Sequence, residues 1–419
     1  TVTELRRRPG SQLRFIFDAG DTTYSDWLAW RTDISGVTCE CLLNVKEGIL
    51  HLIDPRTNTK MAELQHDYLQ AEDIRYMRNT VVGDSLFIAN ISRVPTGVRD
   101  NTNKKNPLNT GFFYVQGSDL RKQFEVTVSV GSQSYTATYT TPDGSEVEHV
   151  EQVQPDYIAQ QLHSQIVANF GSVVNAYIQG TYVFLEKIDP NDTSQLTVTS
   201  GSGTLYIKTS GASSIRQETD LPRRLPNQAN NVVVKTGLEG APTYYRYEAS
   251  TARWIETSAY DSVDRIENAP IEVFFDAYED KWVIDDSPWL GRLSGDDITN
   301  PDPDFVDWGI TGIGAYQGRM VILTGPWVWL SATNKPRQFY RTTVDSLLDT
   351  DPIGVGSSSV SSAAFHYAIP FNKDLILFSS EYQALIPGGS RTLTPGNTSV
   401  VVTSTYSADM NTPPVTLGH

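Results

Sequence analysis

The sequence lacks several features that would mark particular classes of protein. Its only cysteines are Cys39 and Cys41, and this C-x-C spacing places both on one face of a strand. So few cysteines at this spacing favour two reduced thiols over a disulfide or a metal site. No apolar run approaches the roughly 20 residues that cross a bilayer as a helix, so no stable membrane insertion is expected. The opening TVTELRRRPG has neither Met nor an apolar signal region, which indicates a chain that is made in the cytoplasm, trimmed or a fragment.

Positive charge is also scarce. Lys and Arg number 33 against 49 Asp and Glu, which gives a net charge of −16. Tight binding of nucleic acid needs clustered Lys and Arg to neutralise phosphates, so the composition disfavours it. Taken alone, the charge indicates solubility. The run Arg6-Arg7-Arg8 could touch phosphate but is more typical of a solvated or subunit-facing strand end.

Familiar catalytic motifs are absent as well. The sequence has no G-x-S-x-G elbow, Walker loop, H-E-x-x-H or C-x-x-C pair, and its six histidines are scattered. A glycosidase needs two carboxylates at about 5 to 10 Å, but no pair stands out among 49 acids. We therefore predict no catalytic residue, no cofactor and no enzyme.

Aromatic and apolar residues are abundant. Hydrophobic residues make up 39% of the chain, with 20 Tyr, 15 Phe and 8 Trp, which is typical of a globular, β-rich protein. A chain of 419 residues accommodates two or more domains. Short apolar runs separated by turns predict strands in the first part of the chain, at Leu13–Phe17, Cys41–Val45, Ile49–Ile53 and Ser85–Ala89. Such spacing suggests blades or a sandwich, and residues 95–111 are polar enough for a linker.

The middle of the chain predicts a different unit. Phe124–Val130 and Ser134–Thr140 alternate as a hairpin, and a second hairpin is expected at residues 173–188. Between them, Pro155 opens a helical pattern with an apolar residue every fourth position. Together, these elements predict a ββαββ module at about 124–188, which buries one face of its helix on a small sheet. A later hairpin, at residues 271–284, is expected to close the inserted part.

Three segments share one sequence pattern, in which a short polar stretch precedes four or five apolar residues and a turn. They are GDSLFIANI at 83–91, GRMVILTGPWVWL at 318–330 and NKDLILFSSEYQALI at 372–386. This weak repetition is typical of propeller blades. The predicted fold is thus mainly β, an incomplete β-propeller-like body with an inserted α+β module. The expected segments are 1–110, the insertion 111–309, and a return to the body at 310–419.

An acidic loop is the best candidate for an ion site. Its carboxylates suit Ca²⁺, which prefers hard oxygen ligands, but the loop lacks the glycine and the terminal Glu of an EF-hand. A turn held by Asx bonds is favoured instead, and no metal is predicted. The weak candidate ligands are Asp296, Asp297, Asp302 and Asp304. Nearby aromatics could stack on sugars, although strand-borne aromatics usually belong to a core; they are Trp327, Trp329, Phe339 and Tyr340.

The same loop carries a family resemblance. GDDITNPDPDF at 295–305 resembles the G-D-x-x-T-N-P-x-P-S-F signature of podovirus tail tubular protein B, the tail nozzle of short-tailed phages. Further runs resemble the family in the same order: PDGSEVEHV at 142–150, YYRYE at 244–248, GRMVILTG at 318–325 and AIPFNKDLILFSSEYQ at 368–383. Two positions depart from the family pattern: Asp304 replaces a serine, and Gly314-Ala315-Tyr316 replaces an aromatic run.

The resemblance implies a structural virion protein of the tail, a subunit of the tube or nozzle through which DNA is ejected. It further implies a homo-hexamer below the portal adaptor (tail tubular protein A), contact with tail fibres, and assembly in the host cytoplasm. Double-stranded DNA would pass without specific binding. Family members are longer, so this chain is expected to be an amino-terminal, truncated part. The alternatives are a polysaccharide-binding or depolymerising tail component and a calcium-stabilised adhesin.

Overall fold

The computed structural model describes residues 23–211, 214–356, 363–389 and 392–415. The predicted strand at Leu13–Phe17 and the run Arg6-Arg7-Arg8 lie outside the described residues. The expectation of a mainly β protein is confirmed, because strands far outnumber helices along the described chain. None of the helices in these ranges is long and apolar enough to span a membrane.

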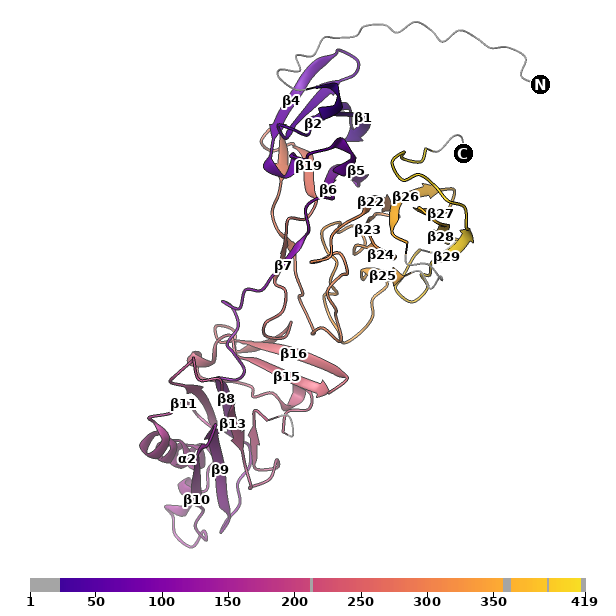
Figure 1. The fold of residues 1–419 in the computed structure, drawn as a ribbon. Coiled ribbons are helices and arrows are strands. Elements are labelled where there is room, and N and C mark those ends of the chain that lie inside the picture. The colour runs from indigo at the N-terminus through magenta and orange to yellow at the C-terminus, as the bar shows by residue number, and fades with distance from the viewer. Residues whose placement is uncertain (1–22, 212–213, 357–362, 390–391, 416–419) are drawn as a thin grey trace, which may run out of the picture.

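Four antiparallel four-stranded sheets form one body of the molecule, drawn in the upper half of Figure 1. Sheet 1 contains β1 (Trp27–Ile34), β2 (Val37–Asn44), β3 (Ile49–Asp54) and β4 (Thr59–Gln65). Sheet 2 contains β5 (Met77–Val82), β6 (Ser85–Asn90), β19 (Ile271–Asp276) and β20 (Lys281–Asp285). Sheet 3 contains β22 (Gly312–Tyr316), β23 (Arg319–Thr324), β24 (Trp327–Leu330) and β25 (Ile353–Gly356). Sheet 4 contains β26 (Phe365–Phe371), β27 (Asp374–Ser379), β28 (Gln383–Ile386) and β29 (Val401–Ser404).

Tight turns connect several neighbouring strands of these sheets. The two residues between β1 and β2, Ser35 and Gly36, both have positive φ (51° and 75°). Gln317 and Gly318 repeat this between β22 and β23, at 48° and 71°. Two consecutive positive φ angles are the signature of the turn whose twist matches that of an antiparallel hairpin.

Successive sheets pack face to face, which explains the repeated apolar runs. Side chains alternate between the two faces of a strand. Along β23, Met320 and Ile322 enter the core between sheets 2 and 3, whereas Val321 and Leu323 enter the core between sheets 3 and 4. The side chains of β6 alternate in the same way, between the core of sheets 1 and 2 and the core of sheets 2 and 3. A strand covered on both sides has no polar face, so its sequence is a continuous apolar run.

Both cysteines lie on β2 in the core of sheets 1 and 2. They are fully buried and carry free thiols, which confirms the prediction of two reduced cysteines. Burial raises the pKa of Cys39 to about 11.

The inserted part leaves and rejoins the body within sheet 2. The partners of β6 are β5 and β19, with Ile88 opposite Ile271. The strand β19 thus completes a sheet of the body, although it falls inside the expected insertion 111–309. Local sequence showed a self-contained hairpin at residues 271–284, and its pairing with β6 is a long-range property that no local pattern encodes.

A narrow neck joins the body to the inserted part (Figure 1). Here β7 (Thr96–Val98) pairs with β18 (Arg265–Glu267), which pairs in turn with β21 (Trp289–Leu290). The expected linker at 95–111 thus contains a paired strand.

The inserted part contains the expected hairpins and helix. The first hairpin is β9 (Gln123–Val130) with β10 (Gln133–Thr140), and the second is β11 (Val174–Gln179) with β12 (Tyr182–Lys187). The main helix, α2 (Pro155–Phe170), follows the short α1 (His149–Gln152). Further strands are β8 (Thr110–Val115), β13 (Leu196–Thr199) and β14 (Ile207–Thr209).

These elements form two sheets instead of the expected single one. Strands β10-β9-β13 make one sheet and β11-β12-β8-β14 make the other. Both contribute to the core that takes up Ile158, Leu162 and Ile166 of α2. The expectation of one sheet was wrong because β8 and β13 come from outside the hairpins and complete each sheet separately.

A third sheet of the inserted part lies nearest the neck. It contains β15 (Val233–Leu238), β16 (Ala241–Glu248) and β17 (Arg253–Thr257). Its Tyr247 shares a core with Phe112 of β8 and Phe184 of β12. The described residues also contain short 3-10 helices: η1 (Tyr24–Asp26), η2 (Asp67–Leu69), η3 (Ile74–Tyr76), η4 (Glu218–Asp220) and η5 (Asn227–Ala229).

Candidate functional site: the acidic junction loop

The acidic loop between β21 and β22 is organised around Arg292. This arginine follows β21 and is only 4% exposed. Its Nε donates to the carbonyl oxygen of Asn300 at 2.7 Å, and its Nη2 lies 2.6 Å from Oδ1 of both Asp297 and Asp302. The guanidinium also lies over the ring of Tyr340, 5.7 Å from the centroid. A planar, always-charged group with several donors suits such a buried junction.

Asp296 forms a closed turn of its own. Its Oδ1 accepts from the backbone N–H of Ile298 and of Thr299, at 3.0 and 3.1 Å. Its Oδ2 accepts from the hydroxyl of Tyr244 at 3.0 Å. Burial would raise the pKa of Asp296, but these hydrogen bonds outweigh burial and lower it. Because Tyr244 belongs to β16, this turn ties the inserted part to the loop.

The other carboxylates of the loop also have hydrogen-bond or ion-pair partners. Asp302 Oδ1 accepts from the hydroxyl of Tyr340 at 2.8 Å, and Asp304 Oδ2 accepts from the indole N–H of Trp329 at 2.9 Å. Together with Asp297 on Arg292, this accounts for all four candidate ligands. Among the residues that the structure describes, no three His, Cys, Asp or Glu side chains are gathered in a way that could hold a metal ion.

Aromatic rings form the base of the loop. Trp289 stacks on Phe339, with ring centroids 5.5 Å apart and planes 5° apart, and Phe305 meets Phe339 edge-on at 5.0 Å. Phe339 and Tyr340 are buried, Trp329 is partly buried and Trp327 remains 39% exposed. Two of the four aromatics considered for sugar stacking are thus core residues, and a third is held by Asp304.

A second buried cation holds the segment between β24 and β25 of sheet 3. Arg319, at the start of β23, is fully buried. Its Nη1 donates to the carbonyl oxygens of Ser331 and Asp351, at 2.6 and 2.8 Å, and its Nη2 donates to that of Asp349 at 2.9 Å. Burial lowers its pKa, and Asp351 opposes that shift. The sequence pattern placed Arg319 in the polar stretch that precedes a strand. Its burial could not be predicted, because it depends on loops that lie 12 or more residues further along the chain.

The PDGSEVEHV run at the far end of the inserted part is an ordered turn. Asp143 Oδ1 accepts from the backbone N–H and the hydroxyl of Ser145, at 3.1 and 2.7 Å. These bonds, helped by Arg121, lower the pKa of Asp143 to about 2. His149 Nδ1 lies 3.3 Å from Asp143 Oδ1. The carboxylate therefore acts as a turn-former.

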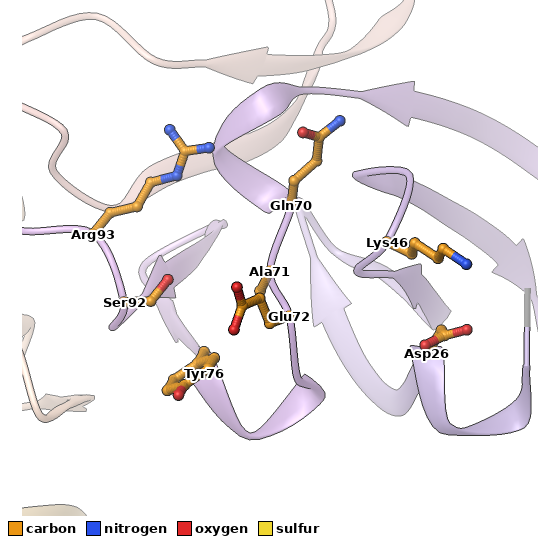
Figure 2. Close-up of a pocket in the computed structure, with 8 residues that line it drawn as sticks. All are labelled: Asp26, Lys46, Gln70, Ala71, Glu72, Tyr76, Ser92 and Arg93. Atoms are coloured by element: carbon orange, nitrogen blue, oxygen red, sulfur yellow. The ribbon is translucent and has the colours of Figure 1, made fainter.

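A hollow of about 830 Å³ lies beside sheets 1 and 2. Figure 2 shows its lining, in which Asp26 and Lys46 lie on one side and Glu72, Tyr76 and Arg93 on the other. Carboxylates and cations are mixed there, so the hollow does not select a ligand of one charge.

The fold and this site define a multi-sheet β protein in which a buried polar cluster ties one part of the chain to another. The bacteriophage nozzle protein family model matches residues 1–419. The chain therefore belongs to that family.

A curated relative agrees with this assignment. The tail tubular protein gp12 of Escherichia phage T7 is 28% identical over 356 residues, which cover 82% of this chain and 43% of the relative. The chain thus spans less than half the length of the relative that it matches. These similarities favour the tail protein over the carbohydrate-active alternative.

Proposed function

We propose that this chain is a subunit of the tail tube or nozzle and that copies of it surround the channel through which DNA is ejected. The observation that carries the proposal is the nozzle-family match along residues 1–419. A tube is built from repeated subunits, and head-to-tail contacts between copies close into a ring. The number of copies is proposed to be six, by the resemblance stated above.

The body is proposed to be an incomplete β-propeller, with sheets 1 to 4 as consecutive blades. Several features support this. Each sheet has four antiparallel strands, neighbours share a core, and β5, β22 and β26 are neighbouring edge strands of successive sheets. Sheet 2 would then be a blade interrupted between Asn90 and Ile271 by the inserted part. The outer face of sheet 4 leaves Ile376 and Phe378 only half-buried, so further blades of a longer protein would continue the body there.

The work of the protein is proposed to be done by interfaces, without a catalytic residue, metal or cofactor. Its net charge of −16 suits a channel wall that repels the phosphates of passing double-stranded DNA. The portal adaptor and the tail fibres are the proposed neighbours, and the virion tail, assembled in the host cytoplasm, is the proposed location. The carboxylates of the junction loop are proposed to be structural.

Two measurements test this function. Electron microscopy of phage particles labelled on this subunit is expected to place the label on a ring in the tail. Sedimentation of the purified protein is expected to show an oligomer of defined size. A protein that stays monomeric and is absent from particles would refute the proposal.

A further inference from the structure

A cavity of about 470 Å³ is lined by strands of three sheets of the body. Its walls come from β1 of sheet 1, from η3 and β5 beside sheet 2, from β26 of sheet 4 and from residues 410–413. Cavities of this size with apolar walls and a few polar groups are where proteins bind small molecules. The apolar side chains of the lining are Leu28, Ile74, Met77, Ile91, Met410 and Pro413.

The wall made by residues 410–413 is held in place by hydrogen bonds. Tyr367 Oη donates to Met410 O at 2.8 Å, and Ala408 N donates to Ser380 O at 3.0 Å. Both partners of this segment belong to sheet 4 or to the turn that follows β27 (Figure 1). The cavity is therefore bounded by ordered contacts on this side.

Arg78 of β5 brings a positive charge to the cavity. Its Nη1 donates to the carbonyl oxygens of Arg75 and Met77, at 2.5 and 3.0 Å, and its guanidinium lies 5.3 Å from the ring centroid of Tyr367. Within the described residues, Nε and Nη2 have no hydrogen-bond acceptor and no carboxylate pairs with the guanidinium. Burial lowers the pKa of Arg78. A cation that is drawn out of water is normally paired with an anion.

His366 adds a second nitrogen-bearing side chain to the lining. It is half-buried on β26, and burial, followed by the charge of Arg78, lowers its pKa. Neither ring nitrogen makes a hydrogen bond within the part of the chain that the structure describes. A neutral imidazole still offers one N–H donor. Two side chains with free donors thus line one apolar cavity.

The other arginine of the lining already has its anion. Arg75 Nη2 lies 2.7 Å from Asp73 Oδ2, and Arg75 Nε donates to both oxygens of the same carboxylate. Its side chain is 65% exposed. The difference between Arg75 and Arg78 identifies Arg78 as the cation that a ligand would neutralise.

We propose that this cavity binds a small monocarboxylate, whose carboxylate lies against Arg78 and His366 and whose apolar part lies among the apolar side chains of the lining. Hydrogen bonds between a guanidinium and a carboxylate are short and strong because both groups are charged. Phosphate or a dicarboxylate would place a second negative charge against apolar walls, which is costly. This site goes beyond the proposed tail function and does not depend on it.

Calorimetric titration of the full chain with hexanoate tests the site. Hexanoate should bind, and it should raise the melting temperature because a ligand that binds only the folded state stabilises it. Hexanol has the same apolar chain without the charge, so it should bind at least about tenfold more weakly. Phosphate should not compete with hexanoate.

Substitutions assign the charge to one side chain. Arg78→Met should weaken hexanoate binding on the order of tenfold or more, and Arg78→Lys should retain part of the affinity. Arg75→Met is the matched control and should leave the affinity unchanged, because Arg75 is already paired. Melting curves show whether each variant folds. If Arg78→Met does not fold, Arg78→Lys and His366→Phe carry the comparison, and each should weaken binding severalfold.

Three outcomes would overturn the proposal. Hexanoate and hexanol might bind equally, with no effect of Arg78→Met, in which case the cavity takes up apolar chains without regard to charge. Hexanoate and benzoate might both fail to bind at millimolar concentration. Hexanoate might instead compete with association between copies of the chain, in which case the natural carboxylate is a side chain of a neighbouring copy. None of these outcomes bears on the tail function, which microscopy of labelled particles tests separately.

Discussion

Replacing Arg292 with methionine should destabilise the junction between the body and the inserted part. Methionine keeps the apolar stem of the side chain and removes the guanidinium, so the effect isolates the charge and its hydrogen bonds. The substitution leaves the carbonyl oxygen of Asn300 without its guanidinium donor, and it leaves the carboxylate of Asp302 with the Tyr340 hydroxyl but without a cation.

The magnitude follows from the burial of each group. Removing one partner of a buried ion pair costs about 3 to 5 kcal/mol. Asp302 is 30% exposed and Asp297 is 74% exposed, so both carboxylates regain water when the cation is lost. We therefore expect the lower end, about 3 kcal/mol of unfolding free energy.

The assay is urea unfolding followed by tryptophan fluorescence. Trp289 is buried and stacked on Phe339 at the base of the loop, so its environment reports on the junction. The midpoint should fall with little change in the dependence on urea. Arg75→Met is the matched control: Arg75 pairs with Asp73 but is 65% exposed, so its loss should cost less than about 1 kcal/mol. Equal effects of the two substitutions would refute the reasoning.

Three further predictions concern other parts of the chain. Burial raises the pKa of Cys39 to about 11, so its thiol should resist Ellman's reagent at pH 8 in the folded protein and react once urea unfolds it; rapid reaction without urea would contradict this. Hydrogen bonds from Ser145 lower the pKa of Asp143 to about 2, so the stability of that turn should be complete above the unfolded pKa of about 4 and fall as the pH drops towards 2. A carboxyl titration by NMR that gave an ordinary pKa would disprove it. A Cβ on Gly388 would collide with backbone at the Tyr316–Lys373 contact, whereas one on Gly396 meets open space. Gly388→Ala should therefore lower the melting temperature by the equivalent of about 1 to 3 kcal/mol, and Gly396→Ala should leave it unchanged; similar melting curves would show that the close approach is absent.

Local patterns predicted individual elements well. The helix at 155–170 followed from Pro155 and the fourfold spacing of Ile158, Leu162 and Ile166, and the hairpins followed from strict alternation around short turns. The loop at 295–305 was expected to be held by Asx hydrogen bonds, and Asp296 makes them. These features depend on residues within a few positions of one another, which is why sequence alone was sufficient.

The tertiary structure decided the features that depend on distant pairing. The amino-acid sequence by itself determined the β-rich class, the helix and its flanking hairpins, the turn-forming role of Asp296 and the family resemblance. Only the folded chain revealed that β19 completes the sheet begun by β6. Only the folded chain buried Arg292 and left Trp308 in solvent. The reason is physical: turns and periodic elements are set by neighbouring side chains, whereas burial and strand order are set by which distant surfaces exclude water together.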